Sequence, residues 1–265
     1  MVSWSGHIVP FIVTVALWFV ATGLIAWADN RERATFSKSL MVGSLVGIGG
    51  LVVILIAALS VEVWAVYLAF IGALMVWGWH ELAFLTGAAA GPRRGLADTG
   101  LTGLARFRQA AATVMHHEVA LAVTGLLLVS LSWDVPNQIG AMVFVLMFAM
   151  RLISKINLFI GVPNTSAEML PEHLSYLKSY FGPRRMTLTL VLSIAGIAAA
   201  AAWFAALALA APAGSAAMVG ASLLATLALL GVLEHLFLAL PFRDGMLWGW
   251  ALPQRRPAEA RRERP

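Results

Sequence analysis

The chain has 265 residues, of which 60% are hydrophobic and only 12% are charged, and its mean hydropathy is +0.85. Soluble domains carry about 25% charged residues, so this composition excludes an ordinary soluble domain and indicates one integral membrane domain over residues 1–265. The net charge of +5 is expected to orient the chain and attract anionic lipid, not nucleic acid. With no cysteine, the chain has no disulfides and no thiolate metal sites.

Long apolar runs predict an all-α fold, a bundle of seven transmembrane helices. In chain order the predicted helices cover residues 8–28, 40–59, 63–85, 115–133, 136–160, 186–210 and 216–240. An Arg-rich tail follows at 241–265. The first run has no positive charge before it and exceeds the usual apolar length of a signal peptide, so we interpret it as an uncleaved helix.

Positive charge is confined to one side of this arrangement. All 18 Lys and Arg residues fall in alternate loops, at the end of the fifth predicted helix or in the tail. The N-terminus and the turns at Glu62, Asp134 and Pro212 carry none. By the positive-inside rule, the N-terminus is expected outside and the C-terminus in the cytoplasm.

The loop between the fifth and sixth predicted helices has a helical pattern of its own. Thr165-Ser166-Ala167-Glu168 has the spacing of a capping box. Apolar side chains then recur at helical intervals, at Leu170, Leu174, Leu177 and Phe181. We expect a short cytoplasmic amphipathic helix on the membrane surface or across the mouth of the bundle, which would carry His173 toward the helix ends.

Histidine and glutamate side chains gather near the cytoplasmic ends of the predicted helices. At 1.5 Å per residue, His80, His117 and Glu234 lie about 24 to 27 Å from the far ends of their runs, which is one level of a hydrocarbon core about 30 Å thick. We call the set the polar layer; its members are His80, Glu81, His116, His117, Glu118, His173, Glu234 and His235. The fifth predicted helix adds two cations, Arg151 and Lys155.

Three interpretations of the polar layer are open. Arg151 and Lys155 share a helix face, so they are natural partners of Glu81, Glu118 and Glu234 in an ion-pair network. Alternatively, histidine and carboxylate ligands suit a divalent metal, and a single histidine can bind a tetrapyrrole. Adjacent His-Glu pairs point about 100° apart on a helix, however, and no di-iron or metalloprotease spacing is present. Proton or ion transport is the third interpretation.

Short motifs spread along the chain carry a family resemblance. They are Val76-Trp77-Gly78-Trp79-His80-Glu81, Gly91-Pro92-Arg93-Arg94, His117-Glu118, Pro136-Asn137-Gln138, Lys155-Ile156-Asn157, Leu170-Pro171-Glu172-His173-Leu174 and Leu233-Glu234-His235. Over nearly its whole length the sequence resembles the PuhE-type photosynthetic complex assembly proteins of purple-type phototrophic bacteria, which are encoded beside the reaction-centre H subunit.

The resemblance implies a protein of the inner, intracytoplasmic membrane that helps to assemble the reaction centre and light-harvesting 1 core complex. Its implied partners are subunits of that complex or other assembly factors, and its implied ligand is bacteriochlorophyll. No catalytic residues come with the resemblance.

Two classes of function therefore compete. In the first, the protein is a non-enzymatic assembly factor that holds bacteriochlorophyll or a precursor on one histidine of the polar layer. In the second, it is a membrane metalloenzyme that acts on a tetrapyrrole or lipid, with the polar layer as its metal site. The lack of a metal-binding motif favours the first class.

Overall fold

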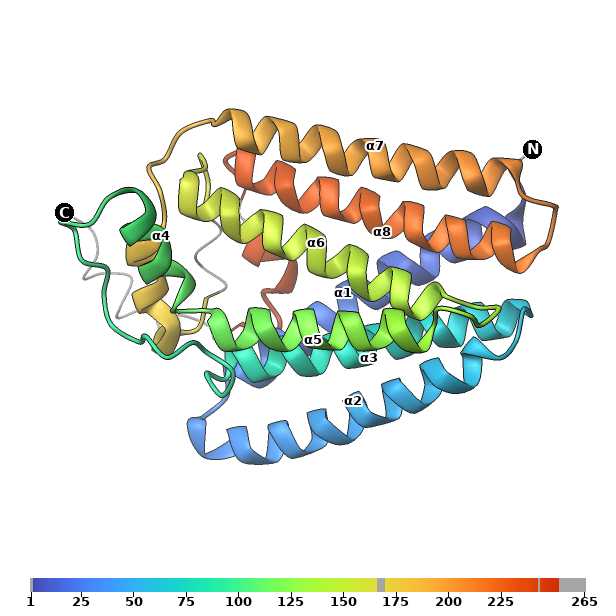
Figure 1. Cartoon of the computed structure of the whole chain (residues 1–265), viewed down its shortest axis with the longest axis horizontal. Helices are drawn as coiled ribbons and strands as arrows, with labels where there is room; N and C mark the ends of the chain where they lie inside the picture. The colour runs from blue at the N-terminus through green and yellow to red at the C-terminus, as the bar shows by residue number, and fades with distance from the viewer. Residues whose placement is uncertain (1, 166–169, 243, 253–265) are drawn as a thin grey trace.

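Helices form all of the regular structure in the described part of the chain. The computed structural model describes residues 2–165, 170–242 and 244–252, and the prediction of an all-α fold is confirmed for them. The longer helices are α1 (Val9–Asp29), α2 (Phe36–Ala58), α3 (Val63–Leu85), α5 (Met115–Leu131), α6 (Ile139–Ile160), α7 (Leu188–Ala210) and α8 (Ala216–Ala239). They run alongside one another as an elongated bundle (Figure 1).

Six of these helices, α1, α2, α3, α6, α7 and α8, are long and apolar enough to cross a membrane. The fourth predicted span is different, because α5 has only 17 residues and is headed by polar side chains. A short helix, α4 (Gly103–Ala111), precedes α5 and meets it at a bend of 72°. The number of candidate spans in the described chain reaches seven only if α4 and α5 together count as one broken span.

The start of α6 shows why some predicted boundaries move. The apolar run begins at residue 136, but the helix begins at Ile139. Asn137 accepts a hydrogen bond from the Ile139 N–H at 3.1 Å, and its side-chain amide donates to the Ala57 carbonyl at 3.1 Å. Asn137 therefore lies just before the N-cap residue Gln138 and is not itself helical, and its side chain binds the first turn of α6 and the end of α2.

Helices α3 and α8 form the centre of the bundle. In their most apolar stretches 56% and 67% of residues are buried, against 11% for α7. The largest core cluster joins the two central helices to α5 and α6, through side chains such as Phe70, Phe144, Leu121 and Leu223. Helix α2 packs mainly on α3, and α7 mainly on α8, so both lie at the periphery.

Glycines allow the close approach of α2 and α3. A Cβ atom added at Gly50 would lie 2.7 Å from the Gly72 carbonyl oxygen, and one added at Gly72 would lie 2.8 Å from the Gly50 carbonyl oxygen. The two backbones therefore touch at this crossing. Small residues that permit such contact are typical of helix pairs in membranes.

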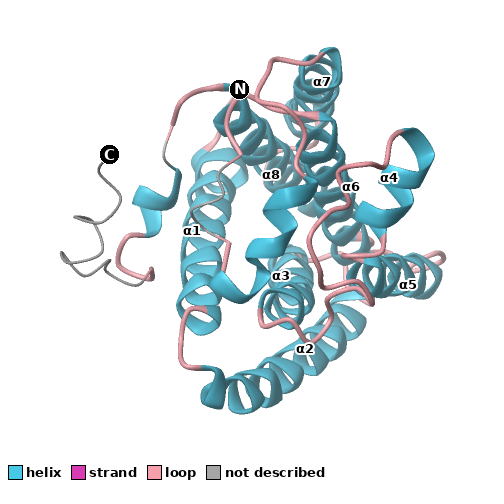
Figure 2. Cartoon of the chain, turned by 90° about the vertical axis from the view of Figure 1, so that its left-hand side faces the viewer, coloured by secondary structure: helices cyan, strands magenta, loops and turns pink. Residues whose placement is uncertain are grey.

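The connections at the two ends of the bundle differ. The N-terminus and the turns that join α2 to α3, α5 to α6 and α7 to α8 lie at one end, and α4 and the longer loops lie at the other (Figures 1 and 2). The described Lys and Arg residues of the loops belong to this second end, which we call the basic end. The side of the membrane that each end faces is an expectation from charge alone.

The loop after α6 forms a 3₁₀-helix, η4 (Glu172–Tyr180), across the basic end. Its buried side chains, Leu174, Leu177 and Tyr180, are three residues apart, as a helix with three residues per turn requires. Leu174 and Leu177 pack on Phe84 at the end of α3. The helix found where a short amphipathic helix is predicted is thus a 3₁₀-helix with buried apolar side chains on the bundle side, and most of the predicted capping box lies outside the described residues.

Hydrogen bonds fasten η4 to the loop between α3 and α5. The Arg93 Nε donates to the Tyr180 hydroxyl at 2.7 Å, and that hydroxyl donates to the Gly95 carbonyl at 2.8 Å. Arg106, on α4, donates to the carbonyl oxygens of Phe159 and Tyr180, each at 3.1 Å. The α3–α5 loop and the segment after α6 therefore form one hydrogen-bonded cap over the basic end.

Candidate functional site

Two ion pairs join α6 to its neighbours inside the bundle. The Arg151 guanidinium donates to Glu81 Oε2 on α3 at 2.9 Å. One turn along α6, the Lys155 ammonium donates to Glu118 Oε1 on α5. Each cation therefore binds one carboxylate, as ionisable groups at membrane depth tend to do.

His117 lies beside the first ion pair and is completely buried. Its Nε2 atom is 3.8 Å from Glu81 Oε1, which is too long for a hydrogen bond. Neither ring nitrogen has a hydrogen-bond partner among the described residues. The imidazole packs against the Phe84 ring, with centroids 4.7 Å apart and planes 33° apart, and so behaves as part of the aromatic core.

The other histidines of the polar layer are engaged separately. His80 lies 3.0 Å from the Thr124 hydroxyl on α5. Each of the next three rings binds a backbone carbonyl oxygen. The His235 ring binds that of Gly231 at 2.8 Å, the His116 ring that of Ala90 at 2.7 Å, and the His173 ring that of Leu85 at 2.8 Å. These histidines thus make local structural contacts instead of converging on a shared point.

His173 is the one member of the polar layer on η4, at the basic end. Burial lowers the pKa of its imidazole below the usual 6.5, and the nearby Arg33 charge acts in the same direction. The hydrogen bond to Leu85 partly opposes this shift. The ring therefore prefers its neutral form, with the proton on Nε2 directed at the Leu85 carbonyl.

The described residues contain no group of three or more His, Asp or Glu side chains arranged to hold a metal ion. The adjacency of His and Glu in the sequence explains this, since the two members of each pair point in different directions. Glu81 faces Arg151 while His80 faces Thr124. Glu118 faces Lys155 while His117 packs on Phe84.

Glu234, on α8, forms no ion pair with either cation, although it lines the same cavity as Arg151. Its carboxylate accepts a hydrogen bond from the indole N–H of Trp18, on α1, at 2.9 Å. No Lys or Arg nitrogen in the described chain lies within ion-pair distance of it. Glu234 is therefore a hydrogen-bonded carboxylate without an ion-pair partner among the described residues.

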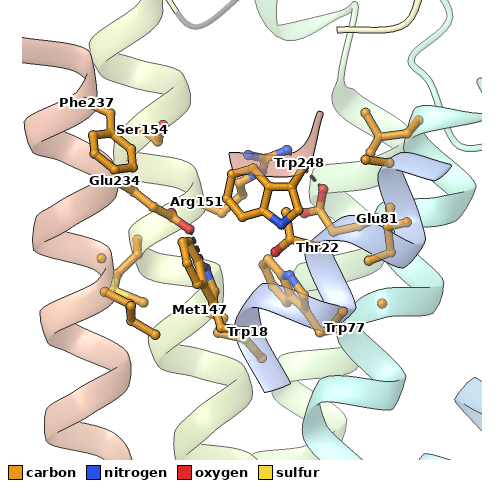
Figure 3. A pocket seen from close by; sticks show the side chains of 18 of the residues that line it. Trp18, Thr22, Trp77, Glu81, Met147, Arg151, Ser154, Glu234, Phe237 and Trp248 are labelled. Carbon is orange, nitrogen blue, oxygen red and sulfur yellow. Dashed lines mark hydrogen bonds and ion pairs between the residues drawn. The ribbon is translucent and has the colours of Figure 1, made fainter. Parts of the chain in front are cut away.

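A cavity of about 350 Å³ separates Glu234 from the Glu81–Arg151 pair. Helices α1, α3, α6 and α8 form its walls, and Leu170 and Phe181 line it toward the basic end. Figure 3 shows Glu234 and Glu81 on opposite walls, with Trp18, Trp77 and Trp248 between them. None of the six histidines, all of which the structure describes, lines the cavity.

Trp248 closes the cavity from the C-terminal segment. After α8 the chain forms a short 3₁₀-helix, η5 (Asp244–Trp248), and Trp248 is buried against Trp18 and Phe19. Its indole N–H donates to the Phe19 carbonyl at 2.9 Å. Gly23 makes room for this segment, because a Cβ atom there would collide with the Trp250 ring and would also lie 3.0 Å from the Trp248 ring.

Several lining residues were not expected from the sequence. The end of α1 contributes Asp29, which is only 3% exposed and accepts a hydrogen bond from the Asn30 side chain at 2.7 Å. Trp18, in the middle of the first predicted helix, and Trp248, in the tail, also line the cavity. The position of Asp29 at the end of an apolar run was a sequence feature that could have identified it as a buried polar residue. The sequence contains no comparable feature for the two tryptophans.

The comparisons with known proteins define a family. A family model described as "Protein of unknown function (DUF3623)" matches residues 4–259. A protein of Rhodobacter capsulatus, described as "Uncharacterized 30.4 kDa protein in puhA 5'region", is 35% identical over 247 residues, which cover 91% of this chain and 89% of that protein. No solved structure matches the chain.

Proposed function

We propose that this chain, which belongs to the DUF3623 family, is a membrane-bound assembly factor for the photosynthetic reaction centre and light-harvesting 1 core complex. The observation that carries the proposal is the similarity, over 91% of the chain, to a protein described as lying in the puhA 5' region of Rhodobacter capsulatus. Its resemblance to PuhE-type assembly proteins, together with the apolar helices, supports the same role.

The arrangement of the polar layer favours a non-enzymatic role over a metalloenzyme. Two of its three carboxylates, those of Glu81 and Glu118, bind cations of the same chain, and its histidines make local contacts. The described residues offer no metal cluster, and an axial histidine for a tetrapyrrole would have to face open space. Since no histidine lines the cavity, the geometry does not favour pigment binding there through a histidine.

We further propose seven membrane spans, with the pair of α4 and α5 accounting for the fourth. The N-terminus would then face outward, and the basic end and the C-terminus would face the cytoplasm. This orientation is supported by the confinement of all 18 Lys and Arg residues to one side of the seven predicted spans. The cap formed by η4 and the α3–α5 loop would be the surface that meets cytoplasmic partners.

Deletion of the gene in its native host tests the assembly role. We expect lower amounts of core complex and bacteriochlorophyll per cell, while complexes that do assemble keep normal primary photochemistry. Absorption spectra of membranes and the flash-induced charge separation per reaction centre measure the two quantities. Normal spectra and normal assembly kinetics in the deletion strain, with the wild-type gene restored as control, would refute the proposal.

A further inference from the structure

The cavity between α1, α3, α6 and α8 carries more negative than positive charge. Its lining contains the carboxylates of Asp29, Glu81 and Glu234 and, among the described residues, a single cation, Arg151. Arg151 is bound to Glu81 at 2.9 Å, and Lys155, which does not line the cavity, is bound to Glu118. Asp29 and Glu234 therefore have no cation of the described chain within ion-pair distance, and the cavity has three carboxylates for one guanidinium.

Unbalanced carboxylates at membrane depth are costly unless a ligand or a proton neutralises them. Glu81, which also lines the cavity, is already engaged, because its Oε2 atom accepts from Arg151 and its buried Oε1 atom lies 3.8 Å from His117 Nε2. The carboxylates of the cavity available to a ligand are therefore those of Asp29 and Glu234.

Aromatic rings surround Glu234 in a way that suits an organic cation better than a metal ion. Trp18 donates to its carboxylate, Trp248 meets Trp18 edge to face at a centroid distance of 5.2 Å, and Phe237 also lines the cavity (Figure 3). Tryptophan faces attract ammonium groups, and a carboxylate beside them adds a charge-assisted hydrogen bond. A metal ion would need several oxygen or nitrogen ligands, which the described residues do not provide.

The remaining wall of the cavity is apolar and limits the size of any molecule that could bind there. It includes leucine and methionine side chains of α3, α6 and α8, at Leu74, Met147, Met150, Leu227 and Leu230. The volume of the cavity, about 350 Å³, is at the lower end of the usual range for ligand pockets, about 300 to 1,000 Å³. A short apolar chain or ring fits such a space, while the hydroxyls of Thr22 and Ser154 offer further hydrogen-bond acceptors.

We propose that this cavity binds a small amphiphilic amine in its protonated form, with the ammonium group at Glu234, Trp18 and Trp248. The apolar part of the ligand packs against the leucine and methionine side chains of α3, α6 and α8. This binding does not depend on the proposed role in assembly. It gives a role to Glu234, the one glutamate of the polar layer that has no cationic partner among the described residues.

Three probes of equal chain length test the charge preference on the full-length protein in dodecyl maltoside at pH 7.5. Octylamine is cationic, octanol is neutral and octanoate is anionic, and their affinities are measured by native mass spectrometry and by the shift in unfolding temperature. We expect saturable binding of one octylamine per chain, at least tenfold tighter than octanol, and no binding of octanoate. Equal affinities for octylamine and octanol, or tighter binding of octanoate, would overturn the proposal.

A substitution then locates the ammonium group. Glu234→Gln retains an oxygen that accepts from Trp18 but removes the charge, so octylamine affinity should fall at least tenfold while octanol affinity is unchanged. The matched control is Glu62→Gln, the same change at an exposed residue in the α2–α3 turn at the other end of the bundle. Unchanged octylamine affinity in Glu234→Gln would refute the placement. The comparison of the three probes on the unaltered protein remains decisive if that variant fails to fold.

Discussion

Lys155 and Glu118 form an ion pair whose side chains are 17% and 18% exposed, so removal of one partner leaves the other charge enclosed. We expect Lys155→Met to destabilise the protein by about 3 to 5 kcal/mol, the usual cost of an uncompensated buried charge. The double variant Lys155→Met/Glu118→Gln should recover most of that loss, because no charge is then left unpaired. Membrane abundance and the detergent-solubilised unfolding temperature measure both effects.

The matched control for this prediction is Lys178→Met, which removes the same charge from an exposed position on η4. It should change stability by less than about 0.5 kcal/mol, as surface substitutions usually do. If Lys155→Met were as mild as Lys178→Met, the ion pair would contribute nothing. A double variant that is no more stable than Lys155→Met would show that Glu118 is not its partner.

His173 provides a pH-dependent contact at the basic end. The folded protein has a lowered pKa at this imidazole, so the unfolded or undocked chain takes up the proton more readily. Stability of the docked η4 helix is therefore fully present above the ordinary pKa of 6.5 and is lost as the pH falls below that value. We expect faster amide hydrogen exchange over residues 172–180 at pH 5.5 than at pH 7.5, after correction for the intrinsic rates.

The variant His173→Gln isolates the contribution of the imidazole to this effect. Its side-chain amide can still donate to the Leu85 carbonyl but does not titrate in this range. The extra exchange at pH 5.5 should therefore disappear, while exchange at pH 7.5 stays close to that of the unaltered protein. An identical acid response in both proteins would assign it to another group.

At the residue scale, the sequence predicts that adjacent His and Glu side chains point in different directions, but not which neighbouring helix each one faces. Glu81 and His80 are neighbours in the sequence, yet one faces Arg151 on α6 and the other faces Thr124 on α5. The cavity could not be predicted from the sequence, for a different reason. Trp18 and Glu234 are 216 residues apart, and only the packing of the first helix against the last brings them together.

The crossing of α2 and α3 depends on contact between two glycine backbones. Gly50→Ala would place a methyl group 2.7 Å from the Gly72 carbonyl oxygen, so the helices must separate, which we expect to cost about 1 to 3 kcal/mol. The neighbouring change Gly49→Ala is the control, because its Cβ atom would meet only the Met75 side chain at an ordinary 3.6 Å. Unfolding temperatures of the two variants compare them directly, and equal values would contradict this account of the helix contact.

At the element scale, apolar length predicted the helices well where a run was uninterrupted. Helix α3 covers residues 63–85, as predicted, and its apolar run is helical from end to end. Predictions were less accurate where polar side chains served local structure. Asn137 delays the start of α6, and η4 winds with three residues per turn, a spacing that Leu174, Leu177 and Tyr180 satisfy as readily as an α-helical one.

At the scale of the whole molecule, the structure separates two kinds of surface. Helices α2 and α7 lie at the periphery and expose apolar side chains, such as Leu45, Ile48, Leu192 and Trp203, as a surface in contact with lipid does. The basic end instead carries a hydrogen-bonded cap with arginine side chains. The proposed role in assembly would use both surfaces, the apolar one for lipid or membrane partners and the cap for soluble segments of partners.

The orientation of this bundle is the prediction with the most direct test. Reporter fusions should be active outside the cytoplasm when placed in the short turns, at Glu62, Asp134 and Gly214, and active inside it at Gly95, Tyr176 and Arg256. The physical reason is that each Lys or Arg resists transfer across the membrane and none of the three turns contains one. Asp134 is the most informative site, because it lies beyond α5, the helix that is too short to be counted as a span by itself. Loss of the α4–α5 span alone would leave six spans and reverse every site beyond it, with Asp134 and Gly214 in the cytoplasm and Tyr176 and Arg256 outside, and that pattern would contradict the seven-span proposal.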